Sequence, residues 1–225
     1  MVFVEDGSLM VKILYEDNHV LVVVKPCNMP VCADDSGDID LLTYLKGYLK
    51  EKYNKPGNVY LGLVHRLDRP VSGVMVFAKT SKAASRLSDS VRTGSIVKKY
   101  FAVVYGGISG SGEFHDRLLK DSKTNMVRVD SSGKDSSLEY NVIGSSKGLS
   151  LVDIHLITGR PHQIRVQFSS RGFPLFGDQR YGKNSKVGEQ IALFSYYLSF
   201  VHPVSKEVME FSLPIPNRYP FSLFK

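Results

Sequence analysis

A short charged motif, residues 65–73, lies between two apolar segments and constrains the fold of this 225-residue chain more than any other feature. Residues 60–64 before it and 73–78 after it are rich in apolar and β-branched side chains, which predicts two buried strands. The motif reads His-Arg-Leu-Asp-Arg-Pro-Val-Ser-Gly, and its Pro and Gly favour a turn. We therefore expect Asp68 at the bend between two strands, where a rigid scaffold can project its carboxylate.

A second basic cluster, residues 158–165, reads Thr-Gly-Arg-Pro-His-Gln-Ile-Arg and can supply a charge opposite to that of Asp68. Together the two segments resemble the signatures of the RluA-type pseudouridine synthases, which have the forms HRLDxxTSG and GRxHQIR. The resemblance extends over nearly the whole chain. It implies an enzyme that isomerises uridine in RNA, by breaking the N1–C1′ bond and rejoining the uracil through C5.

The charge of the chain agrees with a polyanionic partner. Its 29 Lys and Arg outnumber its 22 Asp and Glu, which gives a net charge of +7 and a pI near 9.3. Basic faces concentrate phosphate, although the same excess can serve solubility alone. The resemblance implies rRNA or tRNA as the partner, and it does not distinguish between them.

The sequence predicts a cytoplasmic protein without a membrane segment. Acidic residues stand near Met1, where a signal peptide has basic ones. The longest apolar run, residues 20–24, is too short to cross a bilayer. Cys27 and Cys32 are too few for a disulfide scaffold and are not spaced as zinc ligands, which favours reduced thiols.

The order of predicted elements indicates an α+β fold. Three helices are expected. The first follows Asp40 as its N-cap, and one of its faces carries Leu41, Leu45, Tyr48 and Leu49. The second runs from Ser81 to Gly94 with Ala84, Leu87 and Val91 inward, and the third from Pro161 to Gly172. Strands are expected at residues 12–15, 20–25, 97–105, 113–119, 126–129, 137–143, 149–157, 190–201 and 207–213, the first two as a hairpin.

The resemblance implies a pseudouridine-synthase-like fold. This is a mixed, mainly antiparallel sheet flanked by helices, with a central basic cleft. Residues 1–225 are expected to form a single, monomeric catalytic domain without an extra N-terminal RNA-binding module. Lys25-Pro26, Gly177-Asp178 and Tyr181-Gly182 match further turns of the family and are expected to belong to the scaffold, with Asp178 capping backbone N–H groups.

The resemblance assigns catalysis to Asp68, Tyr100 and Arg165. A carboxylate beside the sugar can act as nucleophile or stabilise an oxocarbenium-like centre. Attack at C1′, attack at C6 and help in removing the C2′ proton all stay open for Asp68. Arg165 is implied to keep this carboxylate ionised, and Tyr100 to stack on the uracil and take part in proton transfer from C5.

Further residues are implied to bind the substrate. Arg66 is expected to fill the stack behind a flipped uridine, and Ile164 to pack against the base. His65, Arg160 and His162 are phosphate or sugar candidates, although a structural hydrogen bond is as consistent with each of them. Arg160 and Lys183 are expected to contact phosphate. The full set is His65, Arg66, Leu67, Arg160, His162, Gln163 and Ile164.

The reaction is redox-neutral, so we expect no cofactor, and neither a dinucleotide fingerprint, a P-loop nor a paired metal-ligand motif occurs in the chain. Two alternatives stay open. One is a catalytically silent RNA-binding or folding factor on the same scaffold. The other is a glycoside-cleaving enzyme, which needs a second carboxylate that the sequence does not offer convincingly. Val71, where the family has Thr, and Cys27-Asn28 depart from the family pattern.

Overall fold

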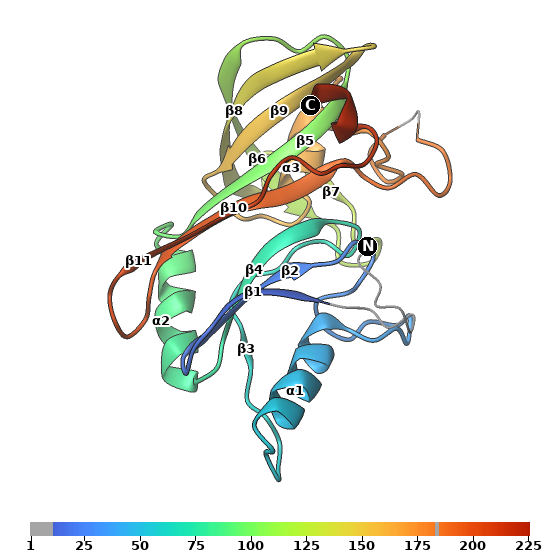
Figure 1. The fold of residues 1–225 in the computed structure, drawn as a ribbon. Helices are drawn as coiled ribbons and strands as arrows, with labels where there is room; N and C mark the ends of the chain where they lie inside the picture. The colour runs from blue at the N-terminus through green and yellow to red at the C-terminus, as the bar shows by residue number, and fades with distance from the viewer. Residues whose placement is uncertain (1–10, 183–184) are drawn as a thin grey trace. The chain divides into compact units, whose positions relative to one another are not determined.

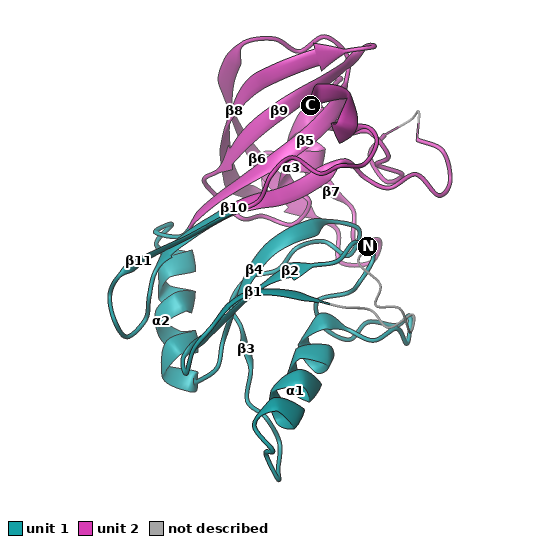
Figure 2. Ribbon diagram, viewed as in Figure 1, with its two compact units in different colours: residues 1–96, 198–212 teal, residues 97–197, 213–225 magenta. Residues whose placement is uncertain are grey.

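The computed structural model describes residues 11–182 and 185–225. The acidic segment after Met1 and Lys183, an expected phosphate contact, lie outside the described residues. The chain forms two compact units (Figure 2). Unit 1 runs to Ile96 and includes Leu198–Ser212, and unit 2 comprises Val97–Tyr197 and Leu213–Lys225. Within the described ranges there are eleven strands and three α-helices (Figure 1), and none of these helices is long and apolar enough to cross a bilayer.

Unit 1 is built on a sheet with the strand order β1-β2-β4-β10, in which β3 also pairs with β4 and β11 with β10. The predicted hairpin is confirmed, because β1 and β2 pair antiparallel around a turn closed by Asp17, whose Oδ1 accepts from His19 N and Val20 N, both at 2.7 Å. The strands are β1 (Lys12–Glu16), β2 (Val20–Lys25), β3 (Gly62–Leu63), β4 (Ser72–Ala78) and β11 (Val208–Ser212), while β10 (Leu193–Val201) continues from unit 2 into unit 1.

The two helices of unit 1 begin where the sequence predicts. Asp40 caps α1 (Leu41–Lys52) by accepting from Thr43 N at 2.9 Å, and the leucines of the predicted face are buried, while Tyr48 is half-buried and bonds Glu16. Helix α2 (Ser81–Arg92) packs against β3 and β4. Its inward face differs from the prediction: Ala83 and Leu87 are buried, whereas Ala84 and Val91 are only half-buried.

The strand predicted for residues 60–64 is much shorter than expected. Only Gly62 and Leu63 pair with β4, and the Tyr60 side chain is 49% exposed. A Cβ at Gly62 would lie 2.9 Å from the Cβ of Ala84, so the chain passes very close to α2 here. The apolar character of this segment therefore reflects contact with a helix as much as sheet pairing.

Unit 2 is a sheet with the order β10-β5-β9-β8-β6-β7. The pairs β5–β9, β8–β9, β6–β8 and β6–β7 are antiparallel, so the predicted mainly antiparallel sheet flanked by helices is confirmed. The central basic cleft stays a prediction. The strands are β5 (Val97–Tyr105), β6 (Ser111–Lys120), β7 (Val127–Val129), β8 (Lys134–Ser146) and β9 (Leu149–Leu156).

The third helix begins later than predicted. Pro161 lies in a turn, and α3 (Gln163–Ser169) starts after His162, whose φ of 51° is left-handed and cannot belong to the helix. The Gln163 side chain holds the turn by accepting from Arg160 N at 3.0 Å. Arg160 and His162 therefore precede a helix of seven residues and are not part of its first turn.

The two faces of the unit 2 sheet have different neighbours. Tyr140, Ile154 and Tyr100 are directly paired across β8, β9 and β5, and therefore share one face. Tyr140 contacts Phe168 of α3, so this is the face that the helix covers. Since side chains alternate along a strand, Lys99 lies on the opposite face.

Candidate active site

Asp68 lies in a tight turn that leads from β3 to β4, as the sequence predicts. The Asp68 carbonyl accepts from Val71 N at 2.9 Å, and this bond closes the turn. Leu67 is 7% exposed and therefore buried, while Arg66 is exposed and Asp68 is half-buried. The alternation places Arg66 and Asp68 on the outer side of a segment that Leu67 holds in place.

A buried lysine binds backbone carbonyls of this turn. Lys25, at the end of β2, has no exposed surface, and its Nζ donates to Arg69 O at 2.9 Å, to Val71 O at 2.8 Å and to Pro26 O at 2.9 Å. Burial lowers the pKa of the Lys25 ammonium to about 8, although the Asp68 carboxylate opposes this shift. The sequence indicated Lys25 only as part of a scaffold turn, yet it holds the carbonyls that fix the backbone around Asp68.

Lys25→Met is expected to destabilise unit 1 by about 2 kcal/mol at pH 7, because three backbone carbonyls lose their donor. The loss of unfolding free energy caused by the substitution should grow as the pH rises. Since burial lowers the pKa of Lys25 from 10.5 to about 8 in the folded protein, the unfolded chain binds more protons between these values. The parent therefore gains stability from this group as the pH rises through that window, and the variant does not. Urea unfolding at several pH values measures this, with exposed Lys82→Met as the control. A pH-independent difference contradicts the assignment.

The other residues of the first motif have distinct surroundings. His65 Nε2 accepts from Val76 N at 3.1 Å, so His65 joins the motif to β4 and carries its proton on Nδ1 in this arrangement. Arg69 forms ion pairs with Asp34 and Asp38. The exposed Arg66 has no ion-pair partner within the described part of the chain, and its contact with RNA stays a prediction.

Arg165 is held in a defined orientation within unit 2. Its Nε and Nη2 donate to the two oxygens of Asp178, both at 2.8 Å, and the Asp178 side chain has no exposed surface. The Arg165 guanidinium also lies over the ring of Tyr181, 5.1 Å from its centroid. A bidentate pair of this kind fixes the guanidinium plane as well as its position.

The residues around Arg165 are themselves fixed. Asp178 accepts from Arg180 N and Tyr181 N, so the predicted cap of backbone N–H groups is confirmed, and the carboxylate has the additional role of binding Arg165. Tyr181 Oη accepts from Val127 N at 2.9 Å and lies 2.7 Å from His162 Nδ1. His162, expected to contact phosphate or sugar, therefore helps to hold the ring beneath Arg165.

The remaining residues of the second motif are engaged within unit 2. Gln163 accepts from Thr158 Oγ1 at 2.8 Å and donates to Ser137 O at 3.0 Å, and Ile164 is 4% exposed. Arg160 Nε donates to Asp135 O at 2.9 Å. These contacts give the segment a structural role, and direct contact of its side chains with RNA stays a prediction.

Tyr100 is buried on the face of the sheet that α3 covers, with 6% of its surface exposed. Lys98, two residues earlier on β5, shares this face and is 8% exposed. Lys98 is not among the site residues that the sequence predicts. The alternation of side chains along a strand distinguishes Lys98 from Lys99, since it places Lys98 on the same face as Tyr100.

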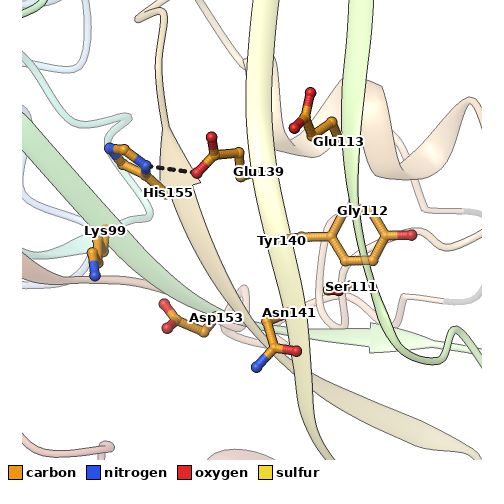
Figure 3. Close-up of a pocket in the computed structure, with 9 residues that line it drawn as sticks. All are labelled: Lys99, Ser111, Gly112, Glu113, Glu139, Tyr140, Asn141, Asp153 and His155. Atoms are coloured by element: carbon orange, nitrogen blue, oxygen red, sulfur yellow. Dashed lines mark hydrogen bonds and ion pairs between the residues drawn. The ribbon is translucent and has the colours of Figure 1, made fainter.

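A shallow hollow of about 360 Å³ lies on the opposite face of the unit 2 sheet (Figure 3). His155 Nδ1 and a carboxylate oxygen of Glu139, on neighbouring strands, lie 3.0 Å apart in this hollow, within hydrogen-bond distance, and Lys99 also lines it. None of the described residues form a group of three or more His, Cys, Asp or Glu that can hold a metal ion. The side chains that line the hollow include Lys99, Glu113, Glu139, Asn141, Asp153 and His155.

Comparisons with known proteins identify the family. The sequence profile described as RNA pseudouridylate synthase matches residues 19–170, which include Asp68, Tyr100 and Arg165. The chain belongs to this family. It is 34% identical to ribosomal large subunit pseudouridine synthase D of Zymomonas mobilis, over 95% of this chain and 72% of that protein. It is 31% identical to ribosomal large subunit pseudouridine synthase C of Buchnera aphidicola, over 92% of this chain and 68% of that protein.

A solved structure shows the same fold. Human RNA pseudouridylate synthase domain containing 4 superposes with a TM-score of 0.78 at 23% identity, and the match covers 94% of this chain and 91% of that one. The resemblance to RluA-type pseudouridine synthases is thus confirmed, and the protein is an RNA pseudouridine synthase, an isomerase. The family match includes residues of both compact units.

The two departures from the family pattern are accommodated in this RNA pseudouridine synthase. Val71 is 2% exposed, which suits an apolar side chain, and its backbone keeps the turn through its bonds to Asp68 O and Lys25 Nζ. Asn28 has a φ of 62°, a left-handed conformation that Asn tolerates better than most residues. This explains how Asn can stand where the family has small or Gly residues.

Proposed function

We propose that this protein converts specific uridines in structured RNA, rRNA or tRNA, to pseudouridine with Asp68 as the catalytic carboxylate. The observation that carries the proposal is the Asp68 turn, which is closed by its own backbone bond and supported by the buried ammonium of Lys25. A catalytic group must be held near its productive geometry, and such a turn restrains the backbone that bears it.

In the proposed reaction Asp68 acts beside the ribose of a flipped uridine, as nucleophile or as stabiliser of positive charge at C1′. Arg165 supplies the positive charge that keeps a carboxylate ionised once RNA has expelled water. Its bidentate bond to Asp178 supports this role, because the guanidinium is oriented before substrate arrives. Tyr100 offers a ring face to the uracil and a hydroxyl for proton transfer.

The substrate class rests on the relatives. Two of them are named for the ribosomal large subunit, which favours rRNA over tRNA as the substrate of this chain. The net charge of +7 suits either RNA. A single catalytic domain that acts as a monomer in the cytoplasm completes the proposal, and these three points stay predictions.

The purified protein is expected to release tritium from C5-labelled uridine in large-subunit rRNA, even after exhaustive dialysis against EDTA, because the rearrangement needs no redox group. Mapping pseudouridines in RNA from cells with and without the protein then locates the target positions. RNA binding without tritium release, and an unchanged pseudouridine map, support the silent RNA-binding factor instead. A need for a specific divalent ion that persists with a prefolded minimal stem-loop contradicts the expected independence of metals.

A further inference from the structure

Lys98 is a buried cation without a counter-charge. It is 8% exposed, and within residues 11–182 and 185–225 no group is hydrogen bonded or ion paired with its ammonium. Burial lowers the pKa of Lys98 below its ordinary value. Other enclosed lysines in this protein are compensated, since Lys25 binds three carbonyls and Lys79 pairs with Glu16 at 2.8 Å.

Enclosing a cation without a counter-charge costs free energy, so we expect the Lys98 ammonium to be compensated by a ligand that is not part of the protein. The Lys98 stem is buried, but Nζ is not one of the fully enclosed, unbonded polar atoms among the described residues, so its tip still reaches solvent. A ligand can therefore meet the ammonium without unfolding anything. The partner that satisfies a lysine best is an anion, because it has three N–H donors and no acceptor.

The position of Lys98 relates it to the proposed catalytic residues of unit 2. It shares a strand face with Tyr100 two residues away, a separation of about 7 Å along a strand. Its Nζ also lies against the second motif, since a Cβ built on Gly159 would be 3.4 Å from it. Lys98 thus lies between the tyrosine expected to stack on the uracil and the segment that leads to Arg165.

We infer that Lys98 Nζ binds a backbone phosphate of the RNA segment that carries the target uridine. The inference rests on the proposed function, because it takes RNA as the substrate. The phosphate candidates suggested by sequence, His65, Arg160 and His162, each bond another part of the protein. Lys98 differs from them in being both enclosed and uncompensated.

The neighbouring residue provides a matched control. Lys98→Met and Lys99→Met each remove one positive charge from the same strand, but Lys99 lies on the opposite face, in the hollow with His155 (Figure 3). We expect Lys98→Met to weaken binding of a target stem-loop by about 10- to 100-fold and to reduce the slope of log K against log salt by about 1. Lys99→Met should change the affinity by less than about twofold, and Lys98→Arg should restore most of it.

A substitution in the RNA tests the contact from the other side. Methylphosphonates, which are uncharged, are placed one at a time at the phosphates around the target uridine. The parent protein and Lys99→Met should lose affinity at one such position to which Lys98→Met is insensitive. The methylphosphonate measurement on the parent protein can be made even if Lys98→Met proves unstable. In that case the parent is compared with Lys98→Gln or Lys98→Arg.

Equal losses for Lys98→Met and Lys99→Met, or equal sensitivity of all variants to every methylphosphonate, overturn the inference. A loss of turnover in Lys98→Met with unchanged affinity and salt slope also overturns it, and points to a contact with the base. The proposed function fails separately, when the parent binds the stem-loop but releases no tritium. The binding measurements still decide the role of Lys98 in that case.

Discussion

Asp68→Asn is expected to lower the rate of pseudouridine formation by at least about 10³-fold, while RNA affinity stays within about twofold of the parent. The amide is nearly isosteric with the carboxylate, and it leaves intact the two hydrogen bonds that hold the turn, from Val71 N to Asp68 O and from Lys25 Nζ to Val71 O. The negative charge that the chemistry needs is lost, whereas binding to phosphate does not depend on it. Tritium release from C5-labelled uridine and filter binding measure the two quantities.

A control separates the loss of this carboxylate from the loss of any negative charge. Asp35 is exposed and lies in the loop between β2 and α1 of the same unit, so Asp35→Asn makes the same change of charge on the surface. It should leave turnover unchanged. Turnover by Asp68→Asn near the parent rate removes Asp68 from the mechanism, and a comparable loss in both variants attributes the effect to net charge.

Asp178→Asn is expected to destabilise the protein by about 3 kcal/mol and to lower kcat by about 10²-fold with a smaller change in KM. An Asn side chain can keep an oxygen toward Arg180 N and Tyr181 N, but its NH2 group then faces the Arg165 Nε donor. The guanidinium loses its bidentate partner in a site where the two side chains are 7% and 0% exposed. Denaturant unfolding and steady-state kinetics on the same preparation report both effects.

A double variant separates stability from catalysis. Adding Arg165→Met to Asp178→Asn removes the unpaired buried guanidinium, while the Asn oxygen still accepts from Arg180 N and Tyr181 N, so this double variant should recover most of the stability lost in Asp178→Asn. Turnover should stay low, because no group replaces the guanidinium. Recovery of turnover together with stability shows that the pair is only structural. An Asp178→Asn protein with parent kcat excludes a positioning role for Asp178.

Local patterns in the chain were enough to predict most of the secondary structure. Helix α1 follows from Asp40 as a cap and from leucines spaced by one turn, and the β1–β2 hairpin from turn formers between two apolar runs. Such features depend on neighbours two to four residues away, which the sequence displays directly. The position of Asp68 in a bend followed in the same way. The start of α3 could not be predicted in this way, because the Gln163 side chain, which shapes the turn before the helix, is bonded to Ser137 O on the distant strand β8.

The sequence by itself determined the family, the order of strands and helices and the residues that carry the proposed chemistry. Only the tertiary structure decided how these residues are supported. Lys25 reaches the carbonyls of Arg69 and Val71, Asp178 binds Arg165, and Lys98 is enclosed without a counter-charge. The physical reason is that burial and the pairing of charges depend on segments that are distant along the chain, and a local pattern of residue types carries no record of which distant groups they meet.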